Sequence, residues 1–306
     1  MCDIWRKDGA DEVEPSFYYH LPRILREINI TGGEPFLRDD LPLIVSIILE
    51  RAPRARIVIS SNGLLTNRIR EMLPEMMRAS RRLGLRISID GATAEMHDKL
   101  RGVPGAFDKA WATLEAVRGL GLRDLGLGFT MSRGNEQDLL PLYERARKMG
   151  LQFTSTIAHS SPVFFGDQED ATPDAGQAAT IYQELRRRQL HSWHPKEWYR
   201  AYFTAGVVDL VRDQRRHIVC PALSAFFFLD PYGVVYPCHI KNWPLGVLDQ
   251  GYEKLAAQHP QIPQQVAACR EHCWMTCTVA PLMRRDFWAI TGTVLWDRLR
   301  AMAGKS

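Results

Sequence analysis

The chain has 306 residues, of which 45% are hydrophobic and 24% are charged, and its formal net charge is +4. A chain of this length buries roughly three quarters of its unfolded surface, so it needs no disulfide framework. The mild charge argues against nucleic-acid binding, because solvated helix faces explain arginine-rich segments such as RRLGLR and ELRRRQL. The longest apolar runs are too short for a bilayer, which takes about 20 residues, and no signal peptide is evident. We expect a cytoplasmic protein without membrane insertion.

Short apolar segments alternate with amphipathic ones between residues 28 and 158. Five strands are predicted, in EINITGG, ARIVISSNG, LRISIDG, LGLGFTMS and LQFTSTIAHS. Helices are predicted between them, in DDLPLIVSIILERA, in residues 66–84, in AFDKAWATLEAVRGLG and in EQDLLPLYERARKMG. This alternation is typical of βαβ units and a parallel sheet. Chemistry in such sheets gathers at the carboxyl ends of the strands, where this chain carries TGGEP, SSNG, SIDG and TMSRGN.

The rest of the chain is less regular. A helix is predicted in AGQAATIYQELRRRQL, and the aromatic segment HSWHPKEWYRAYF is interpreted as packing rather than as a cavity wall. AFFFLDPYGVVYPC predicts a hairpin that turns at residues 231–233. A short helix and one final amphipathic helix, RRDFWAITGTVLWDRLRAM, are expected after it.

Five of the six cysteines lie in the last third of the chain. Without a signal peptide we expect a reducing compartment, where clustered cysteines bind metal more often than they form disulfides. The last three recur every four residues, so on a helix they would share a face. Five thiols exceed the four that zinc needs, and their spacing favours a four-iron cluster, with a structural zinc site as the alternative. The five are Cys220, Cys238, Cys269, Cys273 and Cys277.

The TGGEP segment combines glycines, which let a ligand approach the backbone, with Glu34, which can accept hydrogen bonds from an ammonium group. Together with MCDIW at residues 1–5 it resembles the radical S-adenosylmethionine (SAM) enzymes. In that family three cysteines spaced C-x3-C-x2-C hold a four-iron cluster, and Cys2 matches the third. SSNG, SIDG, HDKLRGVPGAF and GNEQDLLPLYERARKMG resemble later segments of the same domain. The spacing of Cys220, Gly233 and Cys238, followed by WPLGVL, resembles SPASM or twitch auxiliary-cluster domains.

The resemblance implies an α/β fold. Residues 1–215 would form a partial (β/α)6 TIM-like barrel that lacks its first strand, and residues 216–306 a small α+β cysteine-rich domain. The implied cofactors are SAM, a SAM-binding [4Fe-4S] cluster and one auxiliary [4Fe-4S] cluster. The implied SAM-binding residues are Gly32, Gly33, Glu34, Pro35, Asn62, Ser88, Asp90 and Asn135. The implied metal ligands are Cys2, Cys220, Cys238, Cys269, Cys273 and Cys277.

The chain departs from the family pattern in two places. The two earlier cluster cysteines and the first strand are absent, so we expect a chain that starts inside the motif. The tail has five cysteines rather than the seven of a full SPASM domain, which favours the twitch type and one auxiliary cluster.

The resemblance implies reductive cleavage of SAM and abstraction of hydrogen from a peptide or a small molecule. A flavodoxin or ferredoxin would supply the electron. Two alternatives remain at this point. One is a non-catalytic iron–sulfur protein for electron transfer or binding on a barrel remnant, and the other is a zinc-stabilised α/β domain with some other activity.

Overall fold

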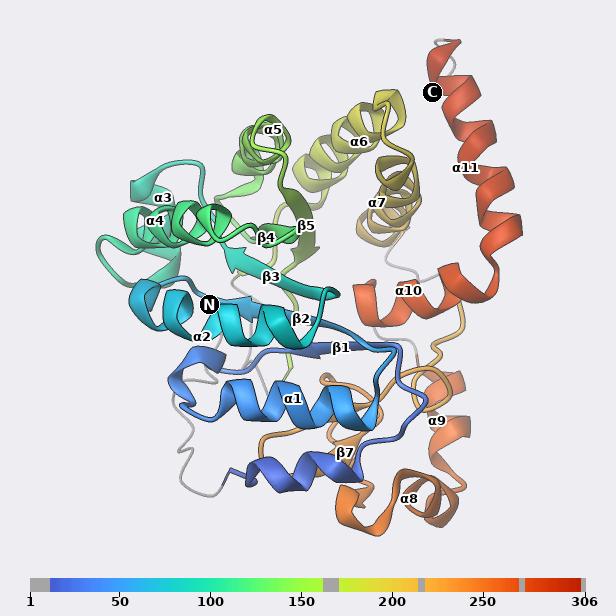
Figure 1. Cartoon of the computed structure of the whole chain (residues 1–306). Coiled ribbons are helices and arrows are strands. Elements are labelled where there is room, and N and C mark those ends of the chain that lie inside the picture. The colour runs from blue at the N-terminus through green and yellow to red at the C-terminus, as the bar shows by residue number, and fades with distance from the viewer. Residues whose placement is uncertain (1–11, 162–170, 214–217, 270–272, 304–306) are drawn as a thin grey trace.

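The computed structural model describes residues 12–161, 171–213, 218–269 and 273–303. Its centre is a parallel five-stranded sheet in the order β1-β2-β3-β4-β5, curled into a partial barrel (Figure 1). The predicted α/β partial-barrel fold is therefore confirmed, and each of the five predicted strands is present. The strands are β1 (Glu27–Ile30), β2 (Arg56–Ser61), β3 (Leu83–Ser88), β4 (Asp124–Met131) and β5 (Gln152–Ile157).

One face of the sheet is apolar and packs against helices. Ile59, Ile87 and Leu127 on this face are fully buried in one continuous core. Their burial explains the apolar strands of the sequence, because a parallel sheet is covered by the helices of its crossovers. The helices on this side are α1 (Leu41–Arg51), α2 (Thr66–Ala79), α4 (Ala106–Gly119) and α5 (Leu139–Lys148).

The other face of the sheet is polar. Side chains alternate between the two faces of a strand, so neighbours in register lie on the same face. Ser60, Arg86 and Gly126 form one such row, and Ser88, Gly128 and Thr154 form the next. We call this surface the polar face. Its amino end is the end at which the strands begin, and its carboxyl end is the end at which they finish.

The structure corrects two expectations in the first half of the chain. The helix that begins at Thr66 ends at Ala79 rather than at residue 84. Arg86 of RRLGLR therefore lies in β3, 6% exposed, instead of on a solvated helix face. A helix not predicted, α3 (Ala94–Arg101), occupies part of the HDKLRGVPGAF segment, and the Thr93 hydroxyl accepts a hydrogen bond from the Met96 N–H at its start.

Two long helices follow the sheet, and the second was not predicted. They are α6 (Ala175–His191) and α7 (Pro195–Asp213), which pack against each other. The aromatic segment of residues 191–203 forms the end of α6 and the first half of α7. The Trp198 indole donates a hydrogen bond to the Ser192 carbonyl, whereas Trp193 is 86% exposed.

The tail begins with a small antiparallel sheet, which confirms the predicted hairpin. Its strands are β6 (Phe228–Leu229), β7 (Val234–Tyr236) and β8 (Gly246–Val247). The predicted final helix is confirmed over Phe287–Met302, and a helix that was not predicted, Thr276–Arg285, ends directly before it at Asp286. The helices of the tail are α8 (Tyr252–Gln258), α9 (Ile262–Ala268), α10 (Thr276–Arg285) and α11 (Phe287–Met302).

Trp274 joins the tail to α7. Its indole N–H donates to the Phe203 carbonyl at 2.8 Å, and its ring lies directly against Gly206. A Cβ at residue 206 would overlap the ring, so only glycine allows this approach. The domain boundary at residues 215–216 stays a prediction.

None of the helices in the described ranges is both long enough and apolar enough to cross a membrane.

Candidate active site

Glu34 ties the ends of β1 and β2 together. Its side chain is 8% exposed, and its two carboxylate oxygens accept backbone hydrogen bonds from the N–H of Asn62 at 2.7 Å and of Phe36 at 3.2 Å. Burial raises the pKa of Glu34, and these hydrogen bonds oppose the rise. The carboxylate is therefore held in place beside the predicted SAM-binding glycines.

The backbone next to Glu34 is open to solvent. Gly32 and Gly33 are exposed, and a Cβ on either residue would meet no atom within 4 Å. Pro35 is buried and starts a 3-10 turn, Pro35–Leu37. This arrangement leaves room for a ligand on the backbone and fixes the chain behind it.

Asp90 and Asn135 join the ends of β3 and β4, and both are fully buried. Asp90 accepts a hydrogen bond from the Thr130 N–H at 2.8 Å. The Asn135 amide donates to the carbonyls of Asp90 and Thr130, both at 2.9 Å, and accepts from the Ser132 N–H at 2.7 Å. Asn135 thus lies at the predicted edge and binds backbone there. That it also touches SAM stays a prediction.

Arg101 is a site residue that the sequence analysis missed. It lies at the end of α3, is 23% exposed in its side chain, and forms an ion pair with the buried Asp90. Its positive charge also helps to lower the pKa of Glu34, against the larger effect of burial. Two buried carboxylates, Glu34 and Asp90, and the guanidinium of Arg101 therefore lie at one edge of the sheet.

His97 fixes the loop between Asp90 and α3. Its Nδ1 accepts a hydrogen bond from the Asp90 N–H at 3.0 Å, so this nitrogen carries no proton. Burial lowers the pKa of His97, and the nearby Arg101 adds to the effect. Gly91 passes so close to the His97 backbone that a Cβ there would overlap it. Asp90 is thereby held from both sides.

The two remaining predicted residues lie at the same edge. Ser88 is the last residue of β3 and is partly buried on the polar face. Asn62 follows β2, and its side-chain oxygen accepts a hydrogen bond from the Leu64 N–H at 2.9 Å. All eight predicted SAM-binding residues therefore lie at the carboxyl ends of β1 to β4.

The tail cysteines do not lie on one helix, contrary to the expectation from their spacing. Cys269 follows the end of α9, Cys273 precedes α10, and Cys277 lies within α10. The chain instead folds so that four thiols line one small pocket, those of Cys220, Cys238, Cys269 and Cys273. The side chain of Cys277 and all of Cys2 lie outside the described residues.

Opposing effects act on the pKa of the Cys238 thiol. Burial raises its pKa, and its neighbours Cys220 and Cys269 raise it further. The backbone N–H groups of Ile240 and Lys241 hydrogen-bond to it and act in the opposite direction. Within the described residues, no three His, Cys, Asp or Glu side chains stand at metal-binding distances from one another.

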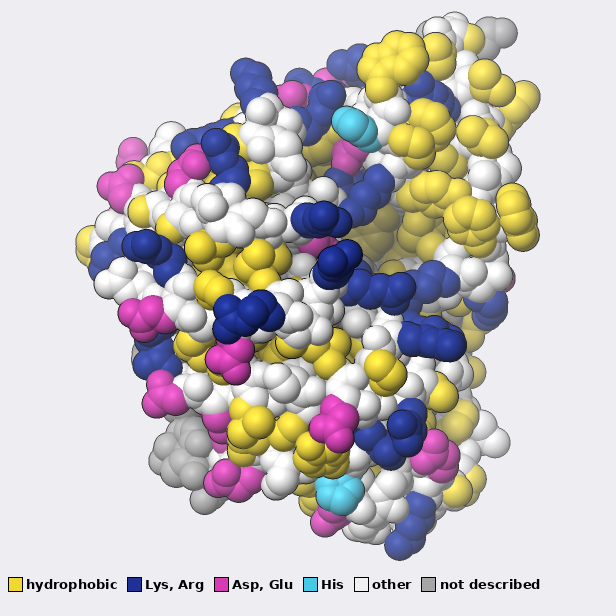
Figure 2. Space-filling view, viewed as in Figure 1, with side chains coloured by type: hydrophobic (Ala, Val, Ile, Leu, Met, Phe, Trp, Pro, Cys, Tyr) yellow, Lys and Arg dark blue, Asp and Glu magenta, His cyan; other side chains and the backbone are white. Residues whose placement is uncertain are grey.

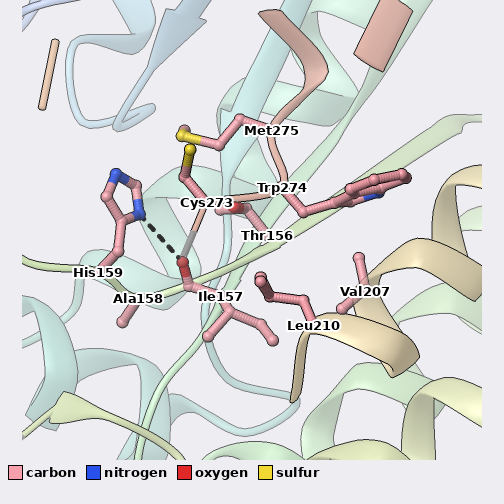
Figure 3. A pocket seen from close by; sticks show the side chains of 9 residues that line it. All are labelled: Thr156, Ile157, Ala158, His159, Val207, Leu210, Cys273, Trp274 and Met275. Atoms are coloured by element: carbon pink, nitrogen blue, oxygen red, sulfur yellow. Dashed lines mark hydrogen bonds between the residues drawn. The ribbon is translucent and has the colours of Figure 1, made fainter. Parts of the chain in front are cut away.

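A second pocket links the sheet to the cysteine pocket (Figure 3). It is lined by His159 after β5, by Val207 and Leu210 of α7, and by Cys273 and Met275 of the tail. The two sulfur atoms lie on the His159 side, and Trp274 turns toward Val207 (Figure 3). The rings of His159 and His239 stand 5.6 Å apart, and burial lowers the pKa of His239 to about 4. The carboxyl end of β5 therefore adjoins the cysteines.

Comparison with known proteins identifies the domain that carries this edge. Residues 10–157, which include β1 to β5, match the Radical SAM superfamily. This part of the chain is a radical SAM domain. Among curated relatives of the whole chain is the AdoMet-dependent heme synthase of Methanosarcina barkeri, which is 28% identical over 68% of this chain and 61% of its own length.

A second relative covers more of this chain. The mycofactocin maturase MftC of Mycolicibacterium smegmatis is 27% identical over 86% of this chain and 65% of its own length. The chain thus spans less than two thirds of the length of these relatives. The solved structure of native anSMEcpe with bound AdoMet and Cp18Cys peptide shares the fold, with a TM-score of 0.54 at 13% identity over 92% of this chain and 91% of that one.

Proposed function

We propose that this protein binds SAM at the carboxyl end of its polar face and uses it, with a [4Fe-4S] cluster, to abstract hydrogen from a substrate. One observation carries the proposal. The open backbone of Gly32 and Gly33 lies beside an anchored carboxylate, Glu34, whose charge interacts with the guanidinium of Arg101. A carboxylate and a guanidinium at one edge complement the ammonium and carboxylate groups of an amino acid such as the methionine part of SAM.

Each residue has a distinct task in this proposal. Glu34 accepts hydrogen bonds from the ammonium group, and Arg101 donates to the carboxylate. Asn135 and His97 hold Asp90, and through it Arg101, in position. Ser88 and Asn62 offer polar groups to the ribose side. A bound cluster and SAM would supply one-electron cleavage of a carbon–sulfur bond, which no side chain can perform.

We also propose that the tail holds one auxiliary [4Fe-4S] cluster of the SPASM or twitch type. The ligands would be four of the five tail cysteines, and four thiols do line one pocket. Backbone N–H groups on the Cys238 sulfur fit this role, because such bonds tune iron–sulfur centres. The substrate, a peptide or a small molecule, would lie toward the pocket at His159, between the two centres.

The relatives support both substrate classes. One is named a maturase and another a heme synthase, so the names do not favour a peptide over a small molecule. A second candidate function is a non-catalytic iron–sulfur protein for binding or electron transfer. It is favoured by the pocket that Cys220, Cys238, Cys269 and Cys273 line, because a cluster held there would not depend on SAM.

The first experiment measures metal and SAM on the anaerobically reconstituted protein. We expect about four irons per auxiliary site, with a [4Fe-4S] spectrum that Cys238→Ala removes; zinc in place of iron would contradict the proposal. SAM affinity should fall ~10-fold or more in Glu34→Gln and in Arg101→Gln, since each loses a charged hydrogen bond. Arg118→Gln, on the exposed face of α4, is the matched control.

Formation of 5′-deoxyadenosine with reduced flavodoxin or ferredoxin then separates the two candidate functions. Cleavage of SAM supports the enzyme. Iron binding without SAM binding would favour the electron-transfer or binding protein.

A further inference from the structure

A cluster of charged side chains occupies the amino end of the polar face, at the opposite end of the strands from the proposed SAM site. We call it the amino-end cluster. Its cations outnumber its carboxylates by five to three. The cations are Arg56, Arg86, Lys196, Arg200 and Arg284, and the carboxylates are Glu27, Asp124 and Glu197.

The carboxylates of this cluster are already shared. One carboxylate oxygen of Asp124 forms an ion pair with Arg56 at 2.6 Å, and the other forms an ion pair with Arg86 at 2.7 Å. Glu27 is bound by Arg56 at 3.5 Å and by Arg284. Each carboxylate oxygen of Asp124 and of Glu27 therefore already has a cationic partner.

Glu197 is also divided between two partners. One of its oxygens pairs with Arg200, and the other accepts a hydrogen bond from the Tyr143 hydroxyl at 3.0 Å. Lys196 and Arg200 therefore share a hydrogen-bond acceptor that carries no charge. The amide oxygen of Gln152 accepts from the Lys196 ammonium at 2.5 Å and from the Arg200 guanidinium at 2.7 Å. One uncharged oxygen lies between two cations.

The excess positive charge affects Lys196 and Arg86 of the cluster. Burial lowers the pKa of Lys196, and the repulsion from Arg200 lowers it further, with Arg56 and Arg86 adding to it. Arg86 is 6% exposed, and its Nε has no acceptor among the residues that the structure describes. A bound anion would relieve both conditions.

The surface around the cluster is hollowed and basic. Figure 2 shows Lys and Arg side chains gathered around a hollow between the sheet and the helices α7 and α10. Exposed arginines also stand directly before the first residue of two strands, Arg82 before β3 and Arg123 before β4. Their field would draw an anion toward the hollow.

We propose that the amino-end cluster is a binding site for a dianionic phosphate group, with Lys196 and Arg200 as its principal ligands. The guanidinium of Arg200 offers a planar pair of donors, and the ammonium of Lys196 offers a point charge, which together suit phosphate oxygens. The ligand displaces the shared contact to Gln152 and balances the two surplus charges. Inorganic phosphate and the phosphate group of a small metabolite present the same chemistry.

Thermal unfolding tests the site with two probes, inorganic phosphate and glycerol 3-phosphate, each compared with potassium chloride at the same ionic strength. We expect either probe to raise the Tm by roughly 2–5 °C beyond chloride. Lys196→Gln should weaken the affinity ~10-fold or more. Arg54→Gln is the matched control, because it removes an exposed arginine outside the cluster and should change affinity by less than about twofold.

Gln152→Glu provides the converse test. It places a carboxylate between Lys196 and Arg200, so the Tm without phosphate should rise and the response to phosphate should disappear. Glycerol 3-phosphate binding more tightly than phosphate would identify a phosphorylated metabolite, and the reverse would identify the free ion. A lower Tm in Gln152→Glu, an equal response to chloride, or an equal loss in Arg54→Gln would overturn the proposal.

Discussion

At the carboxyl end of the polar face, Asp90 and Asn135 are fully buried and hydrogen-bond to the backbone of neighbouring strands. At the amino end, Arg56 and Lys196 remain in contact with water and bind other side chains. The first arrangement fixes the positions of loops, because backbone partners cannot move independently of the sheet. The second sets a local charge and leaves it accessible. One sheet thus carries a rigid end and an electrostatic end, and the following changes test that difference.

The largest effect is expected for Asn135→Ala at the rigid end. The change leaves the Ser132 N–H and the carbonyls of Asp90 and Thr130 without their partner in a buried place. We expect a loss of about 3–5 kcal/mol in the free energy of unfolding, measured by urea denaturation. Asn67→Ala on the exposed side of α2 should cost under about 0.5 kcal/mol. A loss below about 1 kcal/mol in Asn135→Ala would show that this end is not rigid.

A smaller effect is expected for Arg86→Met at the electrostatic end. The change removes a buried cation, but Asp124 keeps Arg56 as a partner and the surplus charge falls by one. We expect a loss of about 1–3 kcal/mol in the free energy of unfolding, less than for Asn135→Ala. Arg187→Met, which breaks an exposed pair with Glu184, should cost under about 1 kcal/mol. If Arg86→Met cost more than Asn135→Ala, the contrast between the ends would be reversed.

The smallest effect is a difference in pH dependence between two acids. Burial raises the pKa of Glu34, so it costs stability as the pH rises above about 4.5, its unfolded value. Burial alone would also raise the pKa of Asp124, but Arg86 and Arg56 outweigh it and hold the pKa below its usual value. Asp124 therefore contributes stability above about pH 3.8 that is lost as the pH falls through its lower folded pKa.

Urea unfolding from pH 2.5 to 6.5 measures both slopes. Glu34→Gln should remove the loss of stability on the alkaline side, and Asp124→Asn should remove the loss on the acid side. Slopes of the same sign for the two variants would contradict the assignment.

The sequence predicts the sheet well because its strands carry an unambiguous signal. Segments such as ARIVISSNG are apolar and end in glycine or asparagine, and the strand-end segments TGGEP and SIDG follow directly from that pattern. The family resemblance then singled out Glu34 and Asp90 within these segments. Helix α3 was missed although Thr93 and Gly102 mark its ends, because the segment was matched to a family loop. Helix α7 was missed because it has buried residues on more than one side, and so lacks a single apolar stripe.

Long-range pairs could not be predicted from the sequence. Arg101 reaches Asp90 only because α3 folds back on the β3 loop, and Arg86 meets Asp124 only because β3 pairs with β4. The cysteine spacing suggested a helical face, whereas the pocket combines Cys220 and Cys238 with two cysteines between α9 and α10. Side-chain contacts of this kind depend on the register of the sheet and on the path of the loops. Local sequence patterns do not contain this information.

The contact between Gly206 and Trp274 has a mechanical consequence. With the indole seated on the backbone of α7 and bonded to Phe203, the loop at residues 273–275 cannot slide along the helix without first lifting the ring away. Cys273 is the adjacent residue, so any displacement of α7 is transmitted across one peptide bond to the cysteine pocket. Helix α7 therefore sets the spacing between the end of β5 and the thiols, although it is part of neither the sheet nor the tail.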